Sequence, residues 1–195
     1  MRVNTKPVTL CMLVGVVFIM TTFTSAVSSS TTQGQSAETA PEHDFDFLVG
    51  DWIVQHHRLK QRLAHSDEWE TFTGTCHTWK LLGGQADVDD NVLNAPAGTY
   101  RAASLRSFDP ATKSWSIWWL DSRHAKQVDP PVVGTFENGI GTFLANDTYN
   151  GKPILVRYIW SGITRNSAKW QQAFSADGGK TWETNWTMEF HRSHT

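Results

Sequence analysis

Hydrophobic and polar residues alternate one by one along most of the chain after residue 50, which is the two-residue period of half-buried strands. The clearest run lies near the C-terminus, where Trp182, Thr184, Trp186, Met188 and Phe190 share one face and polar residues fill the other. The same pattern predicts strands at residues 52–59, 69–79, 100–108, 114–123, 132–136, 140–149, 154–160, 169–174 and 182–191. About nine strands with turn residues between them indicate an all-β fold.

Turn signals connect these predicted strands as hairpins. Asn138-Gly139 is a two-residue hairpin sequence, because both residues tolerate positive φ, and Asn150-Gly151 repeats it. Only residues 41–49 have a pattern compatible with a short helical turn. The sequence has no internal period of the kind that propeller blades require. It therefore predicts an antiparallel barrel or deep sandwich with a short N-terminal helical turn.

The chain divides into three predicted parts. Residues 1–26 have the pattern of a cleavable signal peptide: a basic start, an apolar run, and small residues ending at Ala26. We expect cleavage after Ala26, a periplasmic or secreted protein and no stable membrane insertion afterwards, with an uncleaved anchor as the alternative. Residues 27–43 are rich in Ser, Thr and Gln and are predicted to be a disordered linker. Residues 44–195 form the predicted barrel domain.

Charge and composition limit the choice of partners. The formal charge is −2, and losing Arg2 and Lys6 with the leader makes it about −4, with no basic run elsewhere. Nucleic acid is therefore not an expected partner, because its binding needs Lys and Arg to neutralise phosphates. Ten tryptophans suit an apolar ligand cavity, although a barrel can also use such rings simply to fill its interior. The oligomeric state is not specified.

The sequence Phe47-Leu48-Val49-Gly50-Asp51-Trp52 resembles the Phe-Leu-x-Gly-x-Trp opening of bacterial lipocalin-like (calycin-type) domains of unknown function. Residues 129–134 and 183–186 are similar to the same family. The resemblance spans residues 44–192 and implies an antiparallel lipocalin-like β-barrel. It implies structural roles for Gly50, for Trp52 as the plug of the closed end, and for Arg192 as the partner of that ring.

The same opening occurs in nitrobindin-type haem barrels, which continue with a further glycine after the tryptophan. Here Ile53 follows Trp52, so the resemblance to haem barrels is incomplete and no cofactor is expected.

Residues 175–182, Ser-Ala-Asp-Gly-Gly-Lys-Thr-Trp, match the Asp box that recurs in sialidase propellers. The chemistry of this motif is a turn, in which Asp177 accepts backbone N–H groups and Trp182 covers the loop. The motif occurs once here, so we interpret Asp177 and Trp182 as structural residues.

Several residues are candidates for lining a lumen. Trp119, Trp160 and Trp170 are predicted to line it, and Arg106 and Arg157 to anchor any acidic group of a ligand. A guanidinium binds carboxylate or phosphate through paired hydrogen bonds, which is why arginine is preferred for this role.

Catalytic and metal-binding motifs are not recognisable in the sequence. Asp121, with His124 behind it, is the best candidate for moving a proton, and an ordinary surface pair of Asp121 with Arg123 is the alternative. The acidic stretch 87–91 has the oxygen-rich composition that calcium prefers but lacks the glycine and distal Glu of a calcium loop. We predict a solvated turn there and no metal.

These observations favour a secreted or periplasmic β-barrel that binds a small, largely apolar molecule, with or without an acidic group, in its lumen. One alternative is a cofactor-free isomerase, cyclase or hydratase on the same barrel. The other is a carbohydrate- or protein-binding β domain without an interior site.

Overall fold

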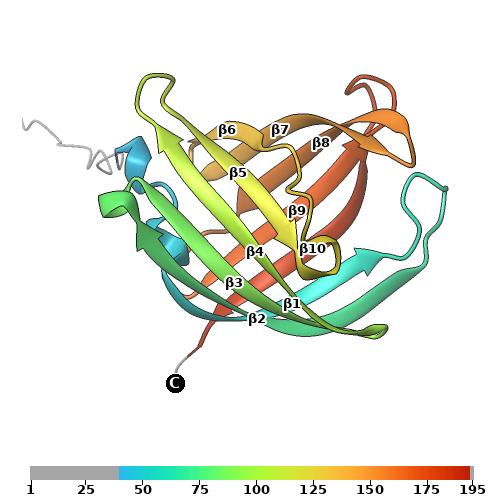
Figure 1. Ribbon diagram of the computed structural model, residues 1–195, viewed down its shortest axis with the longest axis horizontal. Coiled ribbons are helices and arrows are strands. Elements are labelled where there is room, and N and C mark those ends of the chain that lie inside the picture. Colours follow the sequence, from blue (N-terminus) through green and yellow to red (C-terminus); the bar gives the residue numbers. More distant parts are fainter. Residues whose placement is uncertain (1–39, 194–195) are drawn as a thin grey trace, which may run out of the picture. The chain divides into compact units, whose positions relative to one another are not determined.

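The computed structural model describes residues 40–193, which contain ten antiparallel strands closed into a barrel (Figure 1). The strands are β1 (Gly50–Leu59), β2 (Trp69–Leu81), β3 (Ala86–Ala95), β4 (Gly98–Asp109), β5 (Ser114–Asp121), β6 (Val132–Glu137), β7 (Ile140–Tyr149), β8 (Lys152–Ser161), β9 (Ser167–Ser175) and β10 (Glu183–Arg192). Each strand pairs with its neighbour in sequence, and β10 returns to pair with β1. The predicted antiparallel, lipocalin-like barrel is thereby confirmed.

Short 3₁₀ turns supply the remaining regular structure of this part of the chain. They are η1 (Pro41–His43), η2 (Asp46–Leu48), η3 (Leu82–Gly84) and η4 (Ser122–His124). The helical turn expected within residues 41–49 is therefore present as η1 and η2. No helix within residues 40–193 has the length and apolar character needed to cross a bilayer. The predicted signal peptide, residues 1–26, and most of the predicted linker lie outside the described residues.

Strand β3 occupies the stretch that the sequence assigned to a solvated acidic turn, so that prediction is wrong. Asp87, Asp89 and Asn91 alternate with more exposed residues and are themselves buried inside the barrel. Asp and Asn are depleted in strands generally, and their presence here masks the alternation. The two carboxylates can be buried in this strand because Arg106 on the neighbouring strand β4 forms an ion pair with each of them.

Strand β10 also differs from its predicted form. It begins at Glu183, and its register with β9 shifts between Thr184 and Trp186. A bulge of this kind changes which side chains face inward. Trp186 and the residues that alternate after it face the barrel interior, whereas Trp182 precedes the strand and packs on Arg157.

The N-terminal turns close one end of the barrel, where Figure 1 draws them in blue. The Phe45 ring is fully buried there, with its centroid 5.0 Å from those of Trp115 and Phe136. The indole Nε1 of Trp115 donates a 2.9 Å hydrogen bond to the Pro41 carbonyl, and that of Trp52 donates at 2.7 Å to Leu48. The closed end is thus an aromatic plug whose polar ring atoms are satisfied by the backbone of the two turns.

Arg192, the last residue of β10, contacts the segment that leads into β1. Its guanidinium lies 3.8 Å over the Trp52 ring and donates to the carbonyls of Val49 (2.6 Å) and Phe47 (2.8 Å). Gly50 has φ +111°, and a Cβ at this position would lie 2.9 Å from Arg192 Nη1. Gly50 therefore provides both the left-handed backbone and the space that the arginine occupies.

The Asp-box segment forms a tight turn between β9 and β10. The Asp177 carboxylate accepts hydrogen bonds from the Thr181 hydroxyl (2.6 Å) and from the backbone N–H groups of Thr181 and Lys180. These bonds hold the pKa of Asp177 well below its usual range. The Trp182 indole donates to the Gly179 carbonyl and covers the loop.

Candidate functional site

A cavity of about 670 Å³ extends from the barrel interior to the segment between β5 and β6 and the turn between β7 and β8. Its position is at the end of the barrel away from the aromatic plug. Small-molecule sites typically measure roughly 300–1,000 Å³, and β-barrel mouths are a common place for them. The cavity is therefore of the size that a small organic ligand needs.

Aromatic rings form one part of the cavity wall, and charged and polar side chains form another. Trp186 meets Trp119 and Trp170 edge to face, with ring centroids 6.1 and 5.7 Å apart, and Tyr158 meets Trp170 at 4.8 Å. Rings in these mutual contacts restrain one another and present a rigid apolar surface. Further apolar side chains of the wall are Ile117, Val132, Ala145, Ile154, Val156, Trp160, Phe174, Met188 and Phe190.

The residues predicted to line a lumen divide between the two faces of the barrel wall. Trp119, Trp160, Trp170 and Arg106 all line the cavity. Arg157 does not, because its neighbours in β8 point inward and it points the other way, with its guanidinium 4.2 Å from the Trp182 ring. Arg157 is therefore not placed to anchor a ligand in the cavity.

Arg106 lies at the inner part of the cavity within a buried ion-pair cluster. It donates from Nη1 to Asp89 at 2.7 Å and from Nε to Asp87, and it is 2% exposed. Burial raises the pKa of Asp87 although the arginine opposes that shift. Both carboxylates come from β3. Because they form ion pairs with Arg106, its positive charge is already balanced within the protein.

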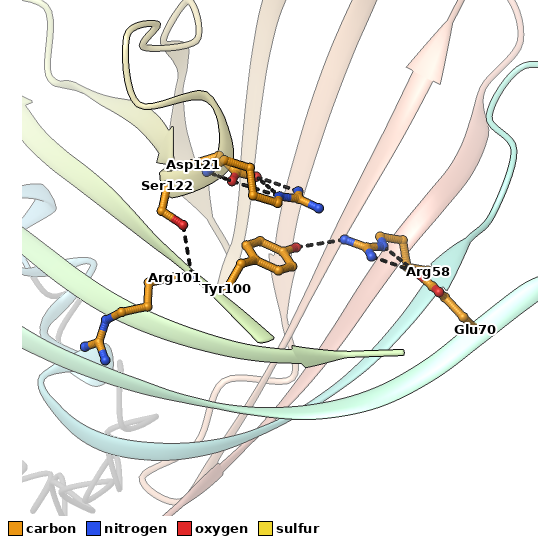
Figure 2. Close-up of polar contacts among 7 residues, drawn as sticks. Arg58, Glu70, Tyr100, Arg101, Asp121 and Ser122 are labelled. Carbon is orange, nitrogen blue, oxygen red and sulfur yellow. Dashed lines mark hydrogen bonds and ion pairs between the residues drawn. The ribbon is translucent and has the colours of Figure 1, made fainter. Parts of the chain in front are cut away.

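Figure 2 shows a second polar network, which links β1 and β2 to β4 and β5 at the outer part of the cavity. The Arg58 guanidinium donates to Glu70 at 2.6 Å and to the Tyr100 hydroxyl at 2.8 Å. The Arg123 guanidinium lies 3.6 Å over the Tyr100 ring and donates to Asp121 at 2.6 Å. Two arginines of the cavity wall are thereby fixed by carboxylates and by one tyrosine.

Asp121 and His124, the candidates for moving a proton, line the outer part of the cavity. Burial opposes ionisation of Asp121, but hydrogen bonds from Arg123 outweigh it and hold its pKa below the usual value. A carboxylate held in this way transfers protons poorly near neutral pH, because the best general acids and bases have a pKa near the working pH. The geometry corresponds to the Asp121–Arg123 pair that the sequence offered as the alternative. His124 lies on η4 and is exposed.

Besides Arg58, the charged rim residues Arg62, Asp129 and Asp147 were not predicted as site residues from the sequence. Arg62 lies in the loop between β1 and β2, with its guanidinium 5.5 Å from the Phe174 ring. Asp129 and Asp147 lie on the half of the rim formed by the β5–β6 segment and β7. Burial and the neighbouring carboxylate of Asp147 raise the pKa of Asp129. Loop residues carry no periodic signal, which is why Arg62 and Asp129 could not be assigned to the site from sequence.

Within residues 40–193, no three His, Cys, Asp or Glu side chains converge as a metal site requires. Cys76 is free and buried, and its burial raises the pKa of the thiol. The thiolate, which is the nucleophilic form, is therefore disfavoured at this position.

The fold and the cavity together define a lipocalin-like barrel with a small-molecule-sized interior. No protein-family profile matches the chain, and no curated protein matches it either. Among solved structures, it is similar to the S-type phycobiliprotein lyase CPES from Guillardia theta, with a TM-score of 0.55 and 11% identity. That match covers 79% of this chain and 93% of the lyase chain. At such low identity the likeness concerns the fold alone.

Proposed function

We propose that this protein is a periplasmic or secreted barrel that binds a small, largely apolar molecule in its cavity. The observation that carries the proposal is the cavity of about 670 Å³, whose wall includes the rings of Trp119, Trp170 and Trp186. Burying a ligand against such a wall yields about 25 cal/mol per Å² of apolar surface removed from water. The likeness to a phycobiliprotein lyase supports a barrel of this type as a holder of small ligands.

The cellular location in this proposal rests on residues 1–26, whose pattern is that of a cleavable signal peptide. A fractionation experiment with a C-terminal tag, together with the N-terminal sequence of the purified protein, tests cleavage after Ala26.

Binding is tested with N-phenyl-1-naphthylamine, an uncharged apolar probe whose fluorescence rises in an apolar environment. Ala145 lines the cavity, so Ala145→Phe fills part of it and is expected to weaken probe binding by about tenfold or more, or about 1.4 kcal/mol. Thr75→Phe, on an exposed outward position of β2, is the matched control and should bind as the wild type does.

Absence of saturable probe binding in the wild type, or equal binding by both variants, would contradict an interior site. Native mass spectrometry of protein from its own host then identifies a co-purifying ligand by mass.

The binding role ranks above the two alternatives for separate reasons. An enzyme that depends on Asp121 would need this carboxylate free to exchange a proton, whereas Arg123 holds it ionised. A surface-binding domain without an interior site would leave the cavity and its aromatic wall without a role. Exposed rings such as Trp79, 41% exposed on β2, are the feature on which that alternative rests.

A further inference from the structure

We propose that the ligand of this cavity carries a carboxylate or a similar anionic group, and that Arg62 is the residue that binds it. The inference rests on the proposed function and specifies the class of ligand: an amphipathic acid whose apolar body fills the aromatic cavity. It also moves the role of anion anchor from Arg106 and Arg157 to a loop residue.

The first argument is the charge balance of the arginines in the cavity wall. Among residues 40–193, four arginines line the cavity, and three have a carboxylate partner within ion-pair distance. These pairs are Arg58–Glu70, Arg106–Asp89 and Arg123–Asp121. Arg62 has no carboxylate of the described residues within 4.0 Å. Among the arginines that line the cavity, Arg62 is therefore the one whose charge has no direct counterion among the described residues.

The second argument is the environment of that charge. Arg62 is half-buried, and its guanidinium packs against the Phe174 ring, which itself lines the cavity. Burial and the nearby charge of Arg58 both lower the pKa of Arg62, so the surroundings disfavour its charged form. An anion brought in by a ligand would offset this cost. The guanidinium fork can bind both oxygens of a carboxylate while the ligand body continues onto the aromatic wall.

The third argument is the charge of the half of the rim formed by the β5–β6 segment and β7. The carboxylates of Asp129 and Asp147 lie there, whereas the Arg62 guanidinium packs on Phe174 of β9. Neither forms an ion pair with an Arg, Lys or His of residues 40–193. Asp129 is close enough to Asp147 and Asp121 for their charges to raise its pKa. This half of the rim repels an anion, so a bound acid would turn its carboxylate towards Arg62.

The test compares two ligands that share an apolar body, dodecanoate and methyl dodecanoate, as competitors of N-phenyl-1-naphthylamine. The wild type is expected to bind the acid about tenfold or more tightly than the ester. In Arg62→Gln this preference should disappear, while the affinities for the ester and for the probe stay within about twofold. Arg62→Lys, which retains the charge but not the planar fork, should keep part of the preference.

Arg101→Gln is the matched control, because Arg101 is an exposed arginine paired with Asp90 on β3. It should retain the wild-type preference for the acid. A preference that survives in Arg62→Gln, or a wild type that binds the probe but does not prefer the acid, overturns this inference and leaves the interior site standing. If the wild type binds neither the probe nor either competitor, the proposed function fails and this inference fails with it.

Discussion

At the residue scale, the free energy of unfolding depends strongly on the buried cluster of Arg106 with Asp87 and Asp89. All three side chains are at most 5% exposed, and each charge depends on the others for compensation. Taking one member out leaves charge in a medium that solvates it poorly. The same residues that form the polar inner part of the cavity therefore also hold β3 against β4.

We expect Arg106→Met to destabilise the fold by about 3–5 kcal/mol, because it leaves two buried carboxylates without their cationic partner. Arg101→Met breaks the exposed pair with Asp90 on the opposite face of the same two strands, and should cost less than about 1 kcal/mol. Urea unfolding of both variants measures the difference. Equal stabilities would show that the cluster contributes no more than a surface ion pair.

At the element scale, the start of β1 depends on the contact between Gly50, Trp52 and Arg192. The glycine has a backbone conformation that other residues adopt at a cost, and the arginine fills the space where a Cβ would be. A side chain at this position would displace the guanidinium from the Trp52 ring and from the carbonyls that precede the strand. The first and last strands of the barrel meet here, so the contact bears on closure.

Gly50→Ala should therefore cost more than backbone strain alone. Gly98, at φ +128° with no atom within 4 Å of its would-be Cβ, is the control, and Gly98→Ala should lose about 1–2 kcal/mol. We expect Gly50→Ala to lose at least about 1 kcal/mol more, which is the size of a cation–π contact. The check is the difference in unfolding free energy between the two variants; no difference would mean that Arg192 relocates freely.

At the scale of the whole molecule, the buried His56 couples global stability to pH. Its ring stacks on Phe72 at 4.6 Å and its Nδ1 accepts a 3.3 Å hydrogen bond from Trp186. Burial and the Arg58 charge lower its pKa from the ordinary 6.5 to about 4. The unfolded chain therefore binds a proton at a higher pH than the folded barrel does, and stability falls as the pH drops from 6.5 towards 4.

His56→Gln removes this titration and should flatten the decline. The lowered pKa corresponds to about 3 kcal/mol lost by pH 4 in the wild type. The variant is therefore expected to lose that much less than the wild type between pH 7 and 4, measured by urea unfolding at each pH. His57→Gln, on the exposed face next to it, should keep the wild-type slope. A variant that declines as steeply as the wild type would exclude His56 as the source.

Much of this architecture could be predicted from residue order. Strict alternation fixes which residues of a half-buried strand face the core, and hairpin turns fix its neighbours. The predicted segments therefore match nine of the ten strands, and Trp119, Trp160 and Trp170 were expected on the cavity side where they lie. The opening at residues 47–52 also indicated the closed end, because its glycine and tryptophan resemble those that close the barrel in lipocalin-like domains.

What the sequence by itself determined is nine of the ten strands, their antiparallel order and the aromatic residues of the interior, since these follow from local periodicity and turn chemistry. Only the tertiary structure decided which charges meet. Asp87 and Asp89 could enter a buried strand because Arg106 lies opposite them on β4. Arg62 lies at the cavity because the β1–β2 loop places its guanidinium against the Phe174 ring. A loop has no periodic pattern from which this position could be predicted. Pairing of buried charges depends on distances across strands and loops, and those distances exist only once the barrel has closed.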